Sequence, residues 1–382
     1  MEYKRLGDYI REVNARNREL KVTKPMGINI DKHFMPSVAN VIGTDLSAYK
    51  LVSKNQFACN LMHVGRDERI PMAMQKDDNP IIVSPAYFVF EITQSETLMP
   101  EYLMMWFSRP EFDRNAWFYT DADVRGGMDK NAFMDMTLPI PSITRQREIV
   151  SEYETLTNRI HLNEQMIQHL EATAQALYRK MFVDNIDKEN LPAGWRMGTI
   201  IDFGEVITGK TPSSENPEDF GEEMPFVTPG DFANYRKFAI SAERYLSDIG
   251  IKRLKGKVLP KGSVIVTCIG SDMGKVVIAS EECITNQQMN SIVVKHGEYS
   301  DYLYYVLSSM TKELKAMALG SSTMPLLNKS DFEKIAVIFP SSNLLMEFSQ
   351  IITVEDNMLL LKLKENLKLM ELQSLLLAKM GQ

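Results

Sequence analysis

The segment FMDMTLPIPS at residues 133–142 has a counterpart, FEKIAVIFPS, at residues 332–341, and each leads into a long stretch of mixed polar and apolar residues. The two stretches close with Lys180-Met181 and Lys379-Met380. The separation never changes, since 332 − 133, 340 − 141 and 380 − 181 all give 199. A constant separation without gaps indicates that one structural unit has been duplicated.

The duplication divides the chain into two globular heads and two long helices. We expect a first head at residues 1–141, a first spacer helix at 142–182, a linker at 183–194, a second head at 195–341 and a second spacer helix at 342–382. The predicted fold class is α+β, with two mixed heads joined by helices that pack as an antiparallel coiled coil in a pseudo-twofold repeat. Since the heads differ in sequence, we expect two different binding surfaces.

In the first spacer helix, apolar residues recur in alternating steps of four and three, which is typical of a heptad seam. The seam consists of Ile149, Tyr153, Leu156, Ile160, Asn163, Ile167, Leu170, Ala174, Leu177 and Met181. Asn163 is its strongly polar member. A buried Asn fixes register or pairing at a cost in stability, whereas a solvated Asn marks a break between shorter helices, and both interpretations stay open.

The second spacer helix is rich in leucine. One possible seam contains Leu360, Leu363, Leu367, Met370, Ser374 and Leu377. Other leucines lie outside it, so we expect this helix to contact more than one neighbour, including helices of partner proteins.

Composition indicates an ordinary globular protein, with 44% hydrophobic and 24% charged residues. The longest apolar run, Tyr102–Phe107, is too short to cross a bilayer. The three cysteines are widely scattered and form no metal-binding pair. We therefore expect a cytoplasmic protein without a metal site and without a membrane partner.

The net charge of −7 argues against nucleic acid only if charge is spread evenly. Phosphate attraction acts over roughly 8–10 Å, so local charge decides. Residues 235–262 contain eight basic residues against two acidic ones. We take Arg236, Lys237, Lys252 and Arg253 as candidate DNA contacts; the alternative is a solvated charged surface.

The run Gly204-Glu205-Val206-Ile207-Thr208-Gly209-Lys210-Thr211 matches the phosphate-binding pattern GxxxxGK[ST]. That pattern needs a following helix whose N-terminus faces the phosphates. Pro212 and Pro217 disfavour such a helix. Lys210 and Ser213 are therefore better interpreted as DNA-backbone contacts or plain surface.

Polar loops supply further DNA-contact candidates. Asn and Gln side chains pair with adenine edges in the major groove, and four of them lie within residues 285–290. Each loop has a plain surface role as its alternative. The candidates are Arg66, Arg69, Arg125, Gln287, Gln288, Asn290, Ser322 and Thr323. No spacing of acids, histidines or nucleophiles commits a group to catalysis, so we expect this chain to be non-catalytic by itself.

An ordered series of motifs resembles the specificity subunit of type I restriction–modification systems. Most of it lies in the second head: Leu191-Pro192-Ala193-Gly194-Trp195, Ile207-Thr208-Gly209-Lys210-Thr211-Pro212, Thr228-Pro229-Gly230-Asp231, Arg244-Tyr245-Leu246, Leu259-Pro260-Lys261-Gly262, Asn286-Gln287-Gln288 and Phe339-Pro340. In the first head, Ile82-Val83-Ser84-Pro85-Ala86-Tyr87 is similar to a family strand. The first head lacks a counterpart of Leu191–Trp195, so its first strand is expected to be shorter.

The resemblance implies two target-recognition domains that read the halves of an asymmetric, bipartite site in double-stranded DNA. It also implies spacer helices that dock two methyltransferase subunits. In the family those partners bind S-adenosylmethionine and methylate adenine, while this chain binds no cofactor itself. Whether restriction and translocase subunits join stays open. The competing hypotheses are a cytoplasmic coiled-coil scaffold that does not bind DNA, and a nucleotide-binding protein that depends on Lys210.

Overall fold

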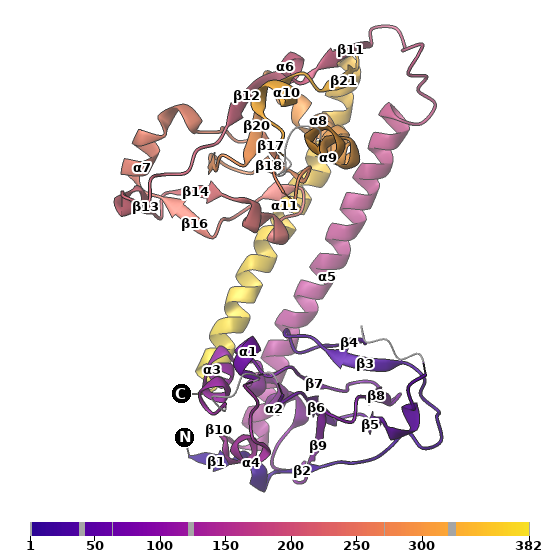
Figure 1. The fold of residues 1–382 in the computed structure, drawn as a ribbon, viewed down its shortest axis with the longest axis vertical. Coiled ribbons are helices and arrows are strands. Elements are labelled where there is room, and N and C mark those ends of the chain that lie inside the picture. Colours follow the sequence, from indigo (N-terminus) through magenta and orange to yellow (C-terminus); the bar gives the residue numbers. More distant parts are fainter. Residues whose placement is uncertain are drawn as a thin grey trace. The chain divides into compact units, whose positions relative to one another are not determined.

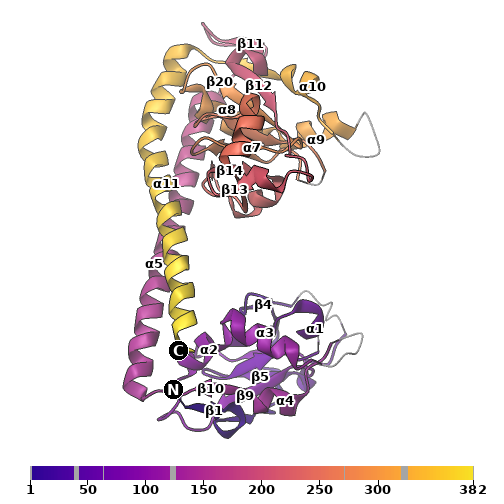
Figure 2. The same ribbon diagram turned by 90° about the vertical axis from the view of Figure 1, so that its left-hand side faces the viewer.

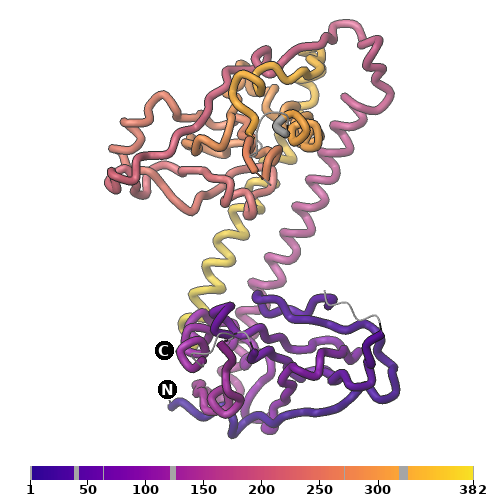
Figure 3. The backbone as a smooth tube through the Cα atoms, viewed as in Figure 1, coloured from indigo at the N-terminus to yellow at the C-terminus, as the bar shows by residue number. Residues whose placement is uncertain are grey.

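A computed structural model describes residues 2–37, 43–62, 64–120, 126–270, 272–319 and 326–381, the side chains of residues 318 and 319 excepted. The chain forms two compact units, unit 1 being Met1–His161 with Leu367–Gln382, and unit 2 being Leu162–Asn366. Figure 3 traces the backbone of both. These units cut across the predicted domains, because each long helix contributes one part to each unit.

Unit 1 is built from small sheets covered by short helices (Figure 1). In spatial order, one sheet contains β2 (Ile10–Glu12), β9 (Phe88–Ile92), β6 (Phe57–Cys59) and β7 (Met72–Met74), and another contains β4 (Phe34–Pro36), β3 (Pro25–Ile28), β8 (Ile81–Val83) and β5 (Lys50–Val52). β1 (Tyr3–Arg5) pairs with β10 (Thr137–Pro139). The helices are α1 (Val64–Asp67), α2 (Pro100–Phe107), α3 (Pro110–Phe118) and α4 (Lys130–Asp135).

An aromatic core holds unit 1 together. Phe57 stacks on Phe90 with ring centroids 5.0 Å apart, and Phe133 of α4 contacts Phe90 at 5.7 Å and Phe107 at 6.1 Å. All four rings are fully buried. Large buried aromatic rings contribute the greatest part of the hydrophobic stabilisation in small cores.

Unit 2 repeats the same plan on a larger scale (Figure 2). One sheet contains β12 (Gly204–Thr208), β20 (Met289–Val294), β17 (Val264–Thr267), β18 (Val276–Ala279) and β15 (Phe238–Ala239), and another contains β13 (Phe220–Gly221), β16 (Arg244–Leu246), β14 (Met224–Val227) and β19 (Ile284–Thr285). β11 (Arg196–Thr199) pairs with β21 (Ala336–Phe339). The helices are α6 (Ile200–Phe203), α7 (Asp248–Arg253), α8 (Tyr299–Ser309), α9 (Thr311–Leu319) and α10 (Lys329–Glu333).

The strand pairings of the two units correspond. The order β2-β9-β6-β7 in unit 1 matches β12-β20-β17-β18 in unit 2, with every neighbouring pair antiparallel. The parallel pair β3 and β8 matches the parallel pair β14 and β19. β1 has three residues and β11 has four.

The two spacer helices are α5 (Ile143–Phe182) and α11 (Ser342–Lys379). The starts of α4 and α10, of β10 and β21, and of α5 and α11 all differ by 199 residues, as in the sequence. Each unit contains packed parts of both helices. In unit 2, Tyr178 and Phe182 of α5 share a buried cluster with Phe348 of α11; in unit 1, Ile149 and Val150 share one with Leu377.

The residues of the first predicted seam are buried or half-buried in the structure. Ile149, Asn163, Ile167 and Ala174 are buried, and the other members are half-buried: Tyr153, Leu156, Ile160, Leu170, Leu177 and Met181. Because α5 is continuous through Asn163, the interpretation of Asn163 as a helix break is wrong. Its amide Nδ2 donates instead to Oδ1 of Asn366 at 2.9 Å, inside unit 2.

The second predicted seam is partly wrong. Leu363 is buried and Leu360 half-buried, but Leu367 is 41% and Met370 56% exposed. Asn366 and Gln373 face inward instead, and Gln373 donates to the Thr157 hydroxyl at 2.7 Å in unit 1. Leucine content misled the prediction, because this helix carries leucine on its outer face as well.

Candidate nucleic-acid interface

Two exposed turns at one end of the large sheet of unit 2 lie side by side. β12 ends at Thr208, which pairs with Asn290 at the start of β20. The next residue but one, Lys210, donates its backbone N–H to the Thr285 carbonyl at 2.9 Å. Thr211 donates its hydroxyl to Oε1 of Gln287 at 2.6 Å. The turns therefore display the ammonium of Lys210 and the amide of Gln287 on one surface.

Gly209 allows this close approach. A Cβ at this position would lie 2.2 Å from the Asn286 carbonyl oxygen and 2.3 Å from that of Thr285, so a larger residue would push the turns apart. Residues 209–216 are not helical, and the 3-10 helix Pro217–Asp219 is the first helical element after β12. The GxxxxGKT match therefore lacks the helix N-terminus on which phosphate binding depends.

The three predicted amides of this region differ in accessibility. Gln287 is exposed, and Gln288 is half-buried, with its backbone N–H bonded to Oδ1 of Asn286 at 3.0 Å. Asn290 is 2% exposed; it accepts from the Thr208 hydroxyl at 2.6 Å and donates to the Leu327 carbonyl at 3.0 Å. The prediction that Asn290 contacts DNA is therefore wrong, because its hydrogen-bonding groups are used inside the fold.

The basic segment 235–262 does not form one free surface. Lys237 is 2% exposed between Asp301 and Asp356, so the prediction that it contacts DNA is wrong. Arg236 turns toward α5 and pairs with Glu164 at 3.1 Å and Glu171 at 3.5 Å. Both cations are thus paired with carboxylates that lie far away in the sequence.

The remaining cations of this segment fall into two groups. Arg253 pairs with Asp219 at 2.7 Å, and Lys257 donates to the Thr208 carbonyl at 2.9 Å. The latter bond places the 3-10 helix Lys255–Lys257 next to the end of β12 and hence near Lys210. Arg244 lies 3.6 Å from the ring centroid of Phe220. In the same segment Lys252, Lys255 and Lys261 are exposed and have no side-chain hydrogen bond or ion pair to any described residue, and the same holds for Lys210 outside it.

Ser213 lies on the exposed loop after Lys210, where its Oγ accepts from the Glu215 N–H at 3.3 Å. In unit 1, Arg66 is exposed and pairs with Asp67 at 2.7 Å, and exposed Arg69 lies 3.9 Å from Asp31. Arg125, Ser322 and Thr323 lie outside the described residues.

The turn between β8 and β9, Ser84–Tyr87, is the unit 1 counterpart of the Gln287 turn, since β8 and β9 correspond to β19 and β20. Pro85 and Ala86 are exposed at its tip. Reasoning from residue types missed this turn, because proline and alanine carry no obvious recognition chemistry. The pairing of topologically equivalent strands is the signal that identifies it.

Neither thiol nor metal chemistry is supported in the described ranges. All three cysteines are buried, and burial raises the pKa of Cys268 to about 11 and that of Cys283 to about 12, so both stay protonated near neutrality. No cluster of three or more metal-ligating side chains occurs in the part of the chain that the structure describes. In the same part, no helix is long and apolar enough to span a bilayer.

Comparison with known proteins shows similarity to one family. Residues 192–371 match the model of the type I restriction modification DNA specificity domain. The specificity subunit of the type I restriction enzyme HindI from Haemophilus influenzae is 26% identical over 416 residues, covering 90% of this chain and 89% of the relative. Over most of its length the chain therefore resembles the type I restriction–modification specificity subunits.

Two further matches agree with this assignment. The MjaIX specificity subunit of Methanocaldococcus jannaschii is 33% identical over 183 residues, which is 47% of this chain and 42% of the relative. The crystal structure of a type I S subunit from M. genitalium aligns with a TM-score of 0.64 at 13% identity, covering 100% of this chain and 96% of that one. At that identity the structural likeness supports the fold.

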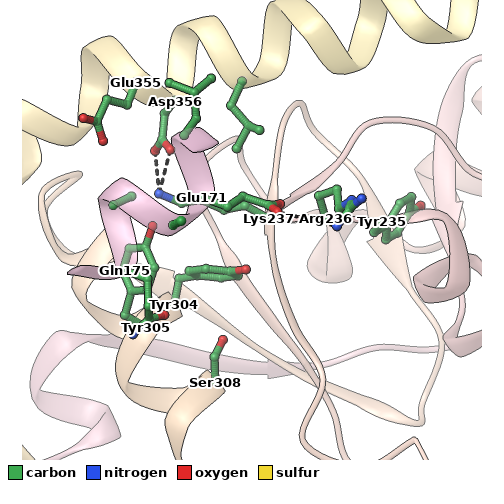
Figure 4. A pocket seen from close by; sticks show the side chains of 14 residues that line it. Glu171, Gln175, Tyr235, Arg236, Lys237, Tyr304, Tyr305, Ser308, Glu355 and Asp356 are labelled. Carbon is green, nitrogen blue, oxygen red and sulfur yellow. Dashed lines mark hydrogen bonds and ion pairs between the residues drawn. The ribbon is translucent and has the colours of Figure 1, made fainter. Parts of the chain in front are cut away.

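Within unit 2, a buried ionic cluster joins the loop before β15 of the large sheet to helices α8 and α11, and Figure 4 shows the Lys237–Asp356 part of it. Lys237 Nζ lies 2.7 Å from Asp301 Oδ1 and 2.6 Å from Asp356 Oδ2. Burial raises the pKa of Asp356 to about 7; Lys237 opposes this shift and Asp301 adds to it. One ammonium is thus shared by two carboxyls, of which one retains a proton more readily than usual.

The raised pKa of Asp356 predicts a pH dependence of stability. Between about pH 4 and pH 7 the folded chain binds more protons at this carboxyl than the unfolded chain does, so its stability falls as pH rises through that window. Relative to Asp356→Asn, the wild type should lose on the order of 1 kcal/mol between about pH 5 and pH 7.5. Urea unfolding followed by circular dichroism at both pH values measures this; parallel pH profiles would contradict it.

Proposed function

We propose that this chain is the DNA-sequence-recognition subunit of a type I restriction–modification complex, reading an asymmetric, bipartite site with its two heads. The observation that carries the proposal is the pair of topologically equivalent turns with different side chains. Unit 2 presents Gln287 beside Lys210, whereas unit 1 presents Pro85 and Ala86. Equivalent positions with different chemistry favour different half-sites.

In unit 2, the division of labour follows from charge and geometry. A lysine ammonium attracts phosphate without regard to sequence, which fits Lys210, Lys252 and Lys255. A side-chain amide distinguishes base edges, which fits Gln287, whose side chain is exposed and whose oxygen accepts the Thr211 hydroxyl. The exposed turns thus combine positioning and reading.

The spacer helices are proposed to pack as an antiparallel coiled coil and to dock two methyltransferase subunits. Within unit 2, the contacts of Asn163 with Asn366 and of Phe182 with Phe348 support opposite helix directions, since the residue number rises along α5 as it falls along α11. In unit 1, a groove of about 470 Å³ between the two helices is lined by Leu156, Leu372 and Leu375. Apolar surface of this kind is typical of a protein interface.

Catalysis is assigned to the partners. The methyltransferase subunits would bind S-adenosylmethionine and methylate adenine in the cytoplasm, with or without restriction and translocase subunits. This chain would contribute sequence recognition and spacing.

The test compares two single substitutions in the purified complex. Lys210→Ala should weaken binding to every duplex and reduce the slope of log affinity against log salt by about 0.9, the value of one phosphate contact. Gln287→Ala should leave the salt slope unchanged and relax methylation at one half-site, as measured by sequencing methylated adenines. A scaffold without DNA binding would show neither sequence-specific gel shift nor any change in methylation.

A further inference from the structure

One short loop of unit 2 contacts both spacer helices. Residues 235–237 lead into β15, the edge strand of the large sheet. The Lys237 carbonyl accepts the Ile278 N–H at 2.8 Å, and the Tyr235 hydroxyl donates to the Ser241 carbonyl. The loop is thereby fixed to the sheet. The contacts that the Arg236 and Lys237 side chains make with the helices therefore attach the whole second head to those helices.

Arg236 extends from this loop to α5. Its guanidinium lies 3.1 Å from Oε2 of Glu164 and 3.5 Å from Oε2 of Glu171. The two carboxylates are seven residues apart, or about two helical turns, and so share one face of α5. The Arg236 guanidinium can therefore contact both carboxylates at only one position along α5.

Lys237 extends to α11. Its ammonium donates to both carboxylate oxygens of Asp356, at 2.8 and 2.6 Å (Figure 4). It also donates to Oδ1 of Asp301 on α8 at 2.7 Å. The rings of Tyr304 and Tyr305 lie 5.5 and 5.2 Å from the same ammonium. Two successive residues of one loop, Arg236 and Lys237, therefore form ion pairs with two different spacer helices, α5 and α11.

Glu164, which pairs with Arg236, also belongs to a hydrogen-bond network that fixes the register of the two helices. Glu164 Oε1 accepts from Asn366 Nδ2 at 2.9 Å, while Asn366 Oδ1 accepts from Asn163 at 2.9 Å. Asn163 and Asn366 are 2% and 5% exposed. A one-residue slip of either helix would leave these buried amides unpaired, which costs about 1–3 kcal/mol per group.

We propose that Arg236 and Lys237 are positioning residues, which hold the second recognition domain at one place on the spacer helices and so restrict the DNA spacer length that the subunit accepts. The proposal rests on the proposed function as a reader of bipartite DNA. Neither side chain contacts DNA; both act through α5 and α11.

Arg236 provides the cleaner test, because its side chain is 41% exposed and its loss leaves no buried charge unpaired. The purified complex is assayed for methylation of duplexes with the preferred spacer and with one base pair more or fewer. Arg236→Ala should reduce the preference for the correct spacer about threefold, the size expected for a partly exposed ion pair. The salt slope of DNA binding should stay unchanged.

Matched variants separate this role from others. Glu164→Gln should reduce the spacer preference in the same way, with no further loss in the double variant, and Arg236→Lys should retain most of it. Lys252→Ala, an exposed cation of the same unit, should lower the salt slope by about 0.9 and leave the spacer preference intact. A lower salt slope with unchanged spacer preference in Arg236→Ala would overturn the proposal. Absence of sequence-specific binding by the wild type would instead refute the function on which it rests.

Discussion

Lys237→Met is expected to lower the free energy of unfolding by about 3–5 kcal/mol, because it leaves two buried carboxyls without their cation. The Lys237 side chain is 2% exposed, and those of Asp301 and Asp356 are 11% and 14% exposed. Water therefore cannot replace the lost ammonium, and methionine fills the volume without supplying charge. Urea unfolding followed by the fluorescence of Trp195, whose ring packs 6.0 Å from Phe182 in the same unit, measures the loss.

A second set of variants tests the stated cause. Lys237→Met combined with Asp301→Asn and Asp356→Asn removes the unpaired charge and should recover a large part of the loss, since a buried ionic group replaced as a whole is far less costly than one broken in half. Lys252→Met, at an exposed lysine, should change stability by less than about 0.5 kcal/mol. An unchanged unfolding midpoint for Lys237→Met alone would show that the buried cluster contributes nothing to folding.

The sequence predicted the large-scale plan of this protein because the plan is repeated. The separation of 199 residues predicted where α5 and α11 lie. Applied to the first seam, the same separation also gives the inward-facing residues of the second helix. Adding 199 to Ile149, Ile167 and Ala174 gives Phe348, Asn366 and Gln373, all of which face inward. The leucine pattern alone pointed to Leu367, which is exposed, because it ignored the repeat.

Short elements were harder to predict. Leu6–Asp8 forms a 3-10 turn that leads into β2, and pairing with β9 rather than local preference makes Ile10–Glu12 a strand. Pro110 begins α3 and cannot continue α2, so this part of the chain forms two helices rather than one.

Candidate DNA contacts could be predicted by chemistry but not by accessibility. Gln287 and Asn290 are three residues apart and similar in type, yet one is exposed and the other is bonded to Leu327, 37 residues away. Arg236 and Lys237 are likewise basic, but carboxylates on distant helices occupy both. Such partners arise only when the chain folds, so local composition overstates the basic surface.

Phe133→Ala and Phe332→Ala are also expected to lower the free energy of unfolding strongly. The two residues occupy the same place in the repeat, and each is fully buried. Phe133 belongs to α4 in unit 1 and Phe332 to α10 in unit 2. Removing a buried phenyl ring costs about 3–5 kcal/mol through lost burial and the cavity left behind. Each variant should therefore destabilise its own unit by that amount.

Hydrogen exchange resolved by peptide distinguishes the two units in the intact chain. In Phe133→Ala, amides of β6 and β9 should exchange about a hundredfold to a few thousandfold faster while those of β17 and β20 keep their protection, since about 1.4 kcal/mol corresponds to a factor of ten. Phe332→Ala should give the reverse. Phe118→Ala, at a ring that is 80% exposed, is the control and should leave both patterns unchanged. Equal loss of protection in both units from either core variant would mean that they unfold as one cooperative block, and the division into two cores would then have no energetic meaning.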